Sequence, residues 1–420
     1  MMINHIGRLS RRLPALAAQA AAAVPAAQAA LAGLTGAALL ALLSACAMAP
    51  PVAEKSPPDA LPTAPAVATA PAAVAATAAA PAPAPPAALR RPKAHWIAVD
   101  WAALPGWSDD RAAELWPALR AGCVRPAPAW AEVCARAIAF SPPDDGFARD
   151  FLQRELTPYR IESIDGGASG LATGYFEPLI NASRLRKPGF NVAIHPPPAD
   201  LAQRKPWYSR QQIDSLPAAA AALRGQEIAW VASPLELLIL QIQGSGRLRI
   251  TEPDGSQRTL RLAFAGHNDQ PYQSVGRWLI DQGELRAEGA NWPAIRDWGR
   301  RAAPARLQQM MWSNPRVVFF REEPLPEPAP GPRGAQGVPL TPGRSVAVDP
   351  QAVPYGTPLW LDTTEPLSAR PLRRLVMAQD TGSAIVGAVR IDYFWGLGEQ
   401  AEQQAGRMKQ PLRLWALWPR

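Results

Sequence analysis

The feature that most restricts the fold is the stretch 47–93, which consists mostly of Ala and Pro with scattered Thr, Val and Ser. Such a composition cannot build a hydrophobic core, so residues 46–93 are expected to form an extended linker. The packed structure must therefore come from the chain that begins near His95.

The residues before this linker have the layout of an export signal. Arg8, Arg11 and Arg12 precede the uncharged stretch 13–45, which ends in small residues. The sequence Leu42-Leu43-Ser44-Ala45-Cys46 resembles the lipobox of bacterial lipoproteins. We therefore expect a signal peptide over 1–45, a lipid on Cys46 and, because Ala47 is not Asp, an outer-membrane lipoprotein facing the periplasm. The alternative is an uncleaved transmembrane anchor, which the weak hydrophobicity of the alanine-rich stretch disfavours.

Cys123 and Cys134 are the only cysteines after Cys46. In an exported protein, a pair eleven positions apart favours a disulfide across a short helical hairpin, with two buried thiols as the alternative. The chain has only 4 histidines, and they lack the spacing of metal ligands. No metal and no cofactor are expected.

The net charge of +8 does not indicate nucleic-acid binding. Only five of the 43 basic residues are Lys, and the abundance of Arg, Ala and Pro reflects a GC-rich genome more than a selected basic surface. Export also removes nucleic acid as a partner. At most, the charge favours contact with an anionic polymer or a membrane surface.

The body divides into a helical part and a part rich in short strands. Apolar residues three and four apart predict helices between Trp96 and Phe151, and further helices over 209–223, 272–281 and 292–309. Strands are predicted over 170–176, 235–243, 248–251, 316–320, 344–348 and 375–379. Many short strands with few helices predict a mainly β (α+β) fold or a barrel, not a parallel βαβ array.

The segment 376–398 concentrates the chemistry. Asp380 and Asp392 are its only acids and Arg390 its only base, among apolar and glycine residues. An apolar setting raises a carboxyl pKa, which is what a general acid needs at neutral pH. The alternative is that both acids serve turns or helix caps.

Two kinds of enzyme use such carboxyls. Asp380-Thr381-Gly382-Ser383 is the motif of aspartic proteases, which need two such loops and hence a dimer of this chain. Glycosidases use two carboxyls, one of which protonates the leaving oxygen. A lyase-like cleavage needs only one acid, because a substrate hydroxyl replaces water. Asp392 would be that acid, and Asp380 would keep it protonated or orient it.

Six motifs in order make the chain similar to the membrane-bound lytic murein transglycosylase A family. They are 170–178, 240–246, 264–268, 314–320, 337–345 and 378–396. This resemblance implies a double-psi β-barrel formed by 94–178 and 321–420, a second small β-domain inserted over 179–320, and a substrate groove between them. It also implies cleavage of the MurNAc–GlcNAc bond of peptidoglycan without water, leaving anhydromuramic ends.

The resemblance assigns roles to individual residues. Asp392 matches the family's catalytic acid and base, Asp380 the supporting acid, and Asp349 the third aspartate of the C-terminal module, where a structural role is expected. The expected partners are glycan strands, the outer membrane and complexes of cell-wall synthesis or hydrolysis. The loop 383–386 departs from the family pattern, which more often has a second Gly and a basic residue.

Two groups of residues are predicted to line the groove. They are Thr173, Tyr175 and Glu177 on a glycine-rich strand end, and Gln241, Gln243 and Ser245, which would share one strand face. The alternatives are a tight turn with Glu177 in a surface salt bridge, and a buried polar network between domains. A protein of a different class, a glycan-binding lipoprotein without catalysis, would have the same groove.

Overall fold

The computed structural model describes residues 88–326 and 329–420. The predicted signal peptide, Cys46 and the predicted linker up to residue 87 lie outside the described residues. Within the described parts of the chain, no helix has both the length and the apolar character needed to cross a membrane.

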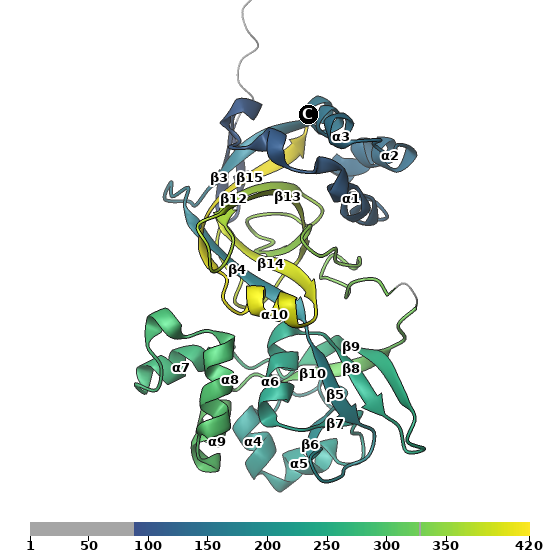
Figure 1. Cartoon of the computed structure of the whole chain (residues 1–420), viewed down its shortest axis with the longest axis vertical. Coiled ribbons are helices and arrows are strands. Elements are labelled where there is room, and N and C mark those ends of the chain that lie inside the picture. The colour runs from purple at the N-terminus through teal and green to yellow at the C-terminus, as the bar shows by residue number, and fades with distance from the viewer. Residues whose placement is uncertain (1–87, 327–328) are drawn as a thin grey trace, which may run out of the picture. The chain divides into compact units, whose positions relative to one another are not determined.

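The first sheet draws on both ends of the described chain (Figure 1). Its strands are β1 (Leu89–Arg91), β2 (Ala94–Ala98), β3 (Leu156–Glu162), β4 (Gly170–Glu177), β11 (Ser345–Val348), β12 (Pro358–Thr364), β13 (Pro371–Asp380), β14 (Arg390–Leu397) and β15 (Lys409–Pro419). They are ordered β1-β2-β3-β15-β12-β13-β11-β14-β4, and β15 also pairs with β4. This extra pairing closes β15, β12, β13, β11, β14 and β4 into a barrel around an aliphatic core that includes Val346, Leu361 and Ile391.

The second sheet comes from the middle of the chain. Its strands are β5 (Leu179–Ser183), β6 (Val192–Ile194), β7 (Ala229–Val231), β8 (Gly246–Thr251), β9 (Gln257–His267) and β10 (Val318–Glu323), in the order β10-β9-β8-β5-β7-β6. Only Pro178 separates β4 of the first sheet from β5 of the second. Proline cannot donate a ladder hydrogen bond, so the chain leaves one sheet and enters the other at this residue.

Helices pack beside both sheets. They are α1 (Trp116–Gly122), α2 (Ala131–Ala139), α3 (Asp145–Glu155), α4 (Arg210–Ser215), α5 (Pro217–Leu223), α6 (Pro234–Gln243), α7 (Val275–Asp281), α8 (Trp292–Arg301), α9 (Pro304–Ser313) and α10 (Glu399–Ala405). Short 3-10 turns are η1 (Trp101–Ala103), η2 (Trp107–Asp109), η3 (Ala112–Leu115), η4 (Pro128–Trp130) and η5 (Ala287–Gly289). The helices α6, α7, α8 and α9 share a core that includes Leu238, Leu279, Trp298 and Met310.

The mainly β, two-domain fold expected from the sequence is confirmed, but three local predictions are wrong. Residues 235–243 form helix α6, not a strand. Trp96 belongs to strand β2, not to a helix. Ordered structure also begins earlier than expected, because Leu89 pairs with Trp96, and Arg91 stacks on the rings of Trp96 and Trp418.

The local sequence explains helix α6. Ser233 and Glu236 form a capping box, Pro234 occupies the first helical position, and Gly244 adopts a left-handed conformation at the C-terminal end. These end signals outweigh the apolar run, whose length alone does not distinguish a strand from a helix.

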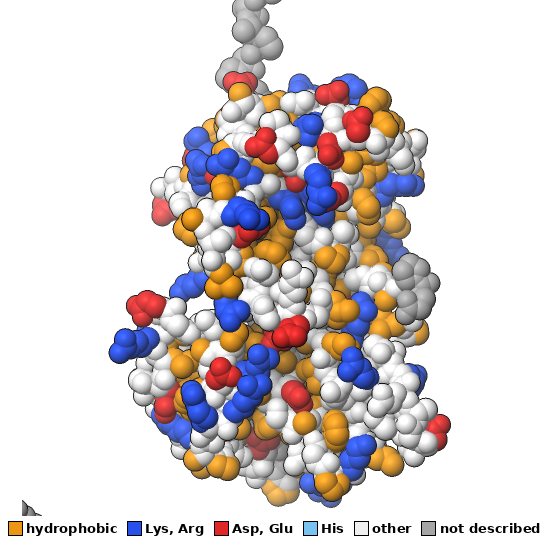
Figure 2. Space-filling view, viewed as in Figure 1, with side chains coloured by type: hydrophobic (Ala, Val, Ile, Leu, Met, Phe, Trp, Pro, Cys, Tyr) orange, Lys and Arg blue, Asp and Glu red, His pale blue; other side chains and the backbone are white. Residues whose placement is uncertain are grey.

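A disulfide joins Cys123 after α1 to Cys134 in α2, with the two Cα atoms 5.1 Å apart. Acidic and basic side chains are interspersed over the face of the molecule in Figure 2. On that face, the positive net charge is not gathered into one basic area.

Candidate active site

Both aspartates of the segment 376–398 lie in one row across the barrel wall. Ala347 of β11 pairs with Asp380 of β13 on one side and with Asp392 of β14 on the other. Asp392 in turn pairs with Thr173 of β4. Because directly paired residues point to the same face of a sheet, these four side chains emerge together on the outer face of the barrel.

Asp392 is a shielded acid at this face. Burial raises its pKa to about 6, and the negative charge of Asp380 adds to the rise. The hydroxyl of Thr173 donates to Asp392 Oδ1 at 2.5 Å, and the charge of Arg390 also favours the ionised form; both oppose the rise. Arg390 Nη2 donates to Thr173 Oγ1 at 2.9 Å, which leaves the Thr173 proton for the carboxylate. The net result is an acid that is partly protonated near neutral pH.

Asp380 accepts hydrogen bonds at both of its carboxylate oxygens, whereas Asp392 accepts one at Oδ1. Its Oδ1 accepts the backbone N–H of Ala335 at 2.9 Å, and its Oδ2 accepts the hydroxyl of Tyr175 at 3.0 Å. Burial raises the pKa of Asp380, and these hydrogen bonds oppose the rise. Tyr175 is buried and lies two residues after Thr173 on the same face of β4. Both oxygens of Asp380 are therefore engaged within the protein.

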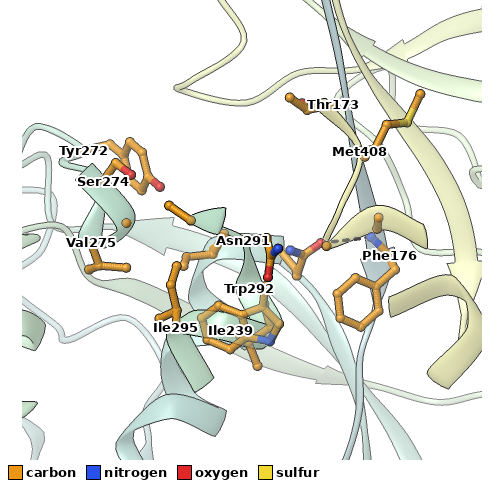
Figure 3. Close-up of a pocket in the computed structure, with 17 residues that line it drawn as sticks. Thr173, Phe176, Ile239, Tyr272, Ser274, Val275, Asn291, Trp292, Ile295 and Met408 are labelled. Carbon is orange, nitrogen blue, oxygen red and sulfur yellow. Dashed lines mark hydrogen bonds between the residues drawn. The ribbon is translucent and has the colours of Figure 1, made fainter. Parts of the chain in front are cut away.

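A cavity of about 240 Å³ opens beside Thr173, between the barrel and the helices of the second domain (Figure 3). Its side chains are all uncharged. They are Thr173, Phe176, Ile239, Ile242, Gln243, Tyr272, Ser274, Val275, Ala290, Asn291, Trp292, Ile295, Ala405 and Met408, with Gly174, Gly276 and Gly406 between them. Burial raises the pKa of Tyr272, and the charge of Asp392 contributes to that rise. The carboxyl of Asp392 is thus close enough to the cavity to affect the pKa of a side chain that lines it.

Two amide side chains present donors at this cavity. Gln243 Oε1 accepts the backbone N–H of Phe176 at 2.9 Å, and Asn291 Oδ1 accepts that of Ala294 at 3.0 Å as the cap of α8. Each amide is fixed by its oxygen, so its NH₂ group is the free end. Within the described residues, neither amide nitrogen has a hydrogen-bond partner.

Some residues predicted to line the groove lie elsewhere. Glu177 is buried and forms two ion pairs, 2.8 Å to Arg247 and 2.7 Å to Arg261, so it fastens the end of β4 to strands β8 and β9. Glu177 is therefore buried with its ion pairs, and is not in a surface salt bridge as the alternative supposed. Removing a partner from a buried ion pair is strongly destabilising, so the role that these contacts give Glu177 is structural.

The other predicted groove residues do not share a strand face. Gln241 is buried on α6 and its amide donates to the carbonyl of Val318 at 3.3 Å. Gln243 does line the cavity, since two residues along a helix rotate a side chain by about 200°. Ser245 follows the C-terminal end of α6 and is not among the residues that line the cavity.

Asp349 acts as a local anchor. Its Oδ2 accepts Lys93 Nζ at 3.0 Å and the N–H of Gly387 at 2.9 Å, and its Oδ1 accepts the N–H of Gln351 at 3.0 Å. Burial works to raise the pKa of Asp349, but these hydrogen bonds lower it below its usual value. Asp349 therefore ties the loop before β14 to the turn between β1 and β2.

Sequence reasoning missed Tyr272, Asn291 and Trp292, and did not give Arg390 a role. Only Arg390 had a visible signal, because it is the single base among the residues around the two acids. In the parts of the chain that the structure describes, no three His, Cys, Asp or Glu side chains lie close enough to hold a metal ion.

Glycosidases use a carboxyl with a raised pKa to protonate the leaving oxygen. Here such a carboxyl lies beside an uncharged cavity lined by amide and aromatic side chains. Residues 171–321 match the MltA specific insert domain, and residues 344–418 match the 3D domain. The chain belongs to the membrane-bound lytic murein transglycosylase A (MltA) family.

Known relatives agree with this assignment. Membrane-bound lytic murein transglycosylase A of Escherichia coli is 32% identical over 278 residues, which cover 65% of this chain and 72% of the relative. The lytic transglycosylase LtgG of Burkholderia pseudomallei has 45% identity and a TM-score of 0.54, covering 77% of this chain and 95% of that one. E. coli MltA with bound chitohexaose has 27% identity and a TM-score of 0.59, covering 80% and 95%.

Proposed function

We propose that this protein is a peptidoglycan lytic transglycosylase that cleaves the MurNAc–GlcNAc bond and leaves 1,6-anhydromuramic ends. The observation that carries the proposal is the raised pKa of Asp392, about 6, beside a cavity with no charged side chain. Such an acid can hold a proton until a glycosidic oxygen takes it. Membership of the MltA family supports the same substrate.

A single acid, Asp392, is enough for this reaction. Asp392 gives its proton to the glycosidic oxygen while the bond from that oxygen to C1 of the muramic residue breaks. The resulting carboxylate then takes the proton of the C6 hydroxyl, whose oxygen forms the new bond to C1. No water is consumed, and Asp392 ends protonated as it began. Thr173 donates to Oδ1, which leaves Oδ2 to carry the transferred proton.

The cavity suits an N-acetylated sugar. The NH₂ groups of Gln243 and Asn291 can donate to an acetamide carbonyl, and Ile239 and Val275 supply apolar contacts for its methyl group. Trp292 offers an indole for a sugar face. Chitohexaose, which the E. coli relative binds, is built from N-acetylated sugars.

The two other hypotheses have less support. In an aspartic protease Asp380 would face a second copy of itself, but Tyr175 and Ala335 of its own chain already hold both of its oxygens. Burial that raises the pKa of a carboxyl lowers the stability of the folded protein at neutral pH. A binding protein without catalysis would gain nothing in return for this loss of stability.

We also propose that Cys46 carries lipid after removal of residues 1–45, and that the Ala- and Pro-rich linker lets the enzyme reach the cell wall from the outer membrane. The lipobox-like sequence before Cys46 supports this. Relatives named as membrane-bound enzymes are consistent with the same location. Complexes of cell-wall synthesis or hydrolysis are the expected protein partners.

The test is digestion of purified sacculi, with released fragments analysed by mass spectrometry. The wild-type protein should release fragments lighter by one water than hydrolysis products. Asp392→Asn should release none and still sediment with sacculi, while Asp254→Asn, in an exposed turn of the second domain, should behave as wild type. Reducing ends would refute the lyase reaction, and sedimentation without release by the wild type would identify a binding protein.

A further inference from the structure

The row of site residues continues by one strand and ends at a lysine. Lys409, the first residue of β15, pairs with Thr173 of β4, and Thr173 pairs with Asp392. Directly paired residues share a face, so Lys409 emerges on the same outer face as the acid. Two strand spacings of about 4.8 Å place its Cα about 10 Å from that of Asp392.

Lys409 differs from the basic residues around it in having no partner. It is exposed, and among the residues that the structure describes no carboxylate lies within ion-pair distance of it. Arg390, on the neighbouring strand, already donates to Thr173 and to the carbonyls of Leu171 and Ile391. Arg296 is paired with Glu402 at 2.6 Å. The charge of Lys409 is therefore available to a ligand.

This charge stands at the edge of the uncharged cavity. Met408, which directly precedes Lys409, lines the cavity on the side of Thr173 (Figure 3). The lining residues recognise neutral groups that every N-acetylated sugar possesses. They do not distinguish a muramic residue from N-acetylglucosamine, which lacks only the lactyl group on O3.

We propose that Lys409 binds a carboxylate carried on the lactyl group of the muramic residue, and so gives the enzyme its preference for peptidoglycan over chitin-like glycans. This inference rests on the proposed function and adds a specificity residue to it. The carboxylate is either the free lactyl acid of a strand without peptides or an acidic group of an attached peptide. A flexible ammonium group on a long stem can reach both.

The experiment compares two Lys409 variants on three ligands, using the full-length protein. The ligands are peptide-bearing glycan strands, amidase-treated strands that carry free lactyl carboxylates, and neutral chitohexaose. Lys409→Gln removes the charge and Lys409→Arg keeps it. Lys187→Gln removes the same charge from an exposed turn of the second domain and serves as the matched control.

For Lys409→Gln, kcat/KM on carboxylate-bearing strands should fall about threefold to tenfold, as expected for the loss of one partly exposed ionic contact. Affinity for chitohexaose should stay within about twofold of the wild type, and Lys409→Arg should restore most of the rate. Added salt should reduce the difference between wild type and Lys409→Gln, because it screens exposed charges.

The pattern of loss identifies the carboxylate. A loss on peptide-bearing strands alone assigns the contact to an acidic group of the peptide, because the lactyl carboxyl of those strands is bound in an amide. A loss on amidase-treated strands alone assigns the contact to the lactyl carboxylate, and a loss on both strand types means that Lys409 binds either carboxylate. An equal loss on chitohexaose, or no loss on any ligand, would overturn the inference. If the wild type formed no anhydro ends, the proposed function would fail, and the role of Lys409 would still be decided by strand affinities measured on the same samples.

Discussion

Replacing Thr173 with Val removes the hydroxyl that bonds to Asp392 and keeps the branched shape of the side chain. This hydrogen bond stabilises the ionised carboxylate, so its loss should raise the pKa of Asp392 further above its value of about 6. A hydrogen bond to a charged group contributes about 1.5–3 kcal/mol, and one pKa unit corresponds to about 1.4 kcal/mol. The expected rise is therefore about one to two units.

The assay is the initial rate of anhydromuropeptide release between pH 4 and 9. The protonated acid is the active form, so the rate should fall as pH rises through the pKa of Asp392. In Thr173→Val this fall should move about one to two units toward alkaline pH. Thr173→Ser keeps the hydroxyl and should leave the fall within about half a unit of the wild type.

Arg390 provides an internal check on the same reasoning. Its charge also favours the ionised form of Asp392, so Arg390→Gln should shift the fall in the same direction. Since Arg390 and Thr173 act through one hydrogen-bonded chain, the shifts of the two variants should not be additive. If Thr173→Val and Thr173→Ser have the same pH profile as the wild type, Thr173 does not control the protonation of the acid.

Three further predictions concern stability. The folded state raises the pKa of Asp392 from 3.8 to about 6, so stability is lost as pH rises through that interval. Asp392→Asn should therefore raise the free energy of unfolding, measured with urea, by up to about 3 kcal/mol at pH 7 and by much less at pH 4. Glu177→Gln leaves Arg261 buried without its ion pair and should cost about 3–5 kcal/mol in urea, without moving the pH profile of any remaining activity. Replacing Cys123 and Cys134 together by Ser should lower stability by about 2–4 kcal/mol, measured by thermal unfolding at equal pH.

The sequence was informative where the signal is local. Asp144 at the start of α3 caps the helix by accepting the N–H of Phe147 at 2.8 Å, where the pattern predicted a helix. The apolar run 235–243 shows the limit of this reasoning. Both a buried strand and a short buried helix allow continuous apolar residues, and only the end signals at Ser233 and Gly244 decide between them.

Pairings distant in sequence could not be predicted from the residues alone. From the sequence alone, Glu177 could be an acid at the surface or in a ligand site, because Arg247 and Arg261 are distant in sequence. Sheet pairing brings both arginines to Glu177. The register of β8 and β9 decides this, and a shift of one residue would turn those arginines to the opposite face. Asn291 and Trp292 reach the cavity for a similar reason, since the packing of α8 places them there.

The arrangement of strands also explains why two nearby aspartates have different roles. Strand β11 lies between them, so their Cα atoms are about 10 Å apart and Ala347 fills only part of the space. Tyr175 donates to one oxygen of Asp380 and the N–H of Ala335 donates to the other, while one oxygen of Asp392 has no hydrogen-bond partner among the described residues. These hydrogen bonds use part of the accepting capacity of Asp380 and oppose the rise of its pKa, so Asp392 is the better placed of the two acids for proton transfer. The geometry therefore favours a reaction in which one carboxyl first gives a proton and then takes one back from the substrate.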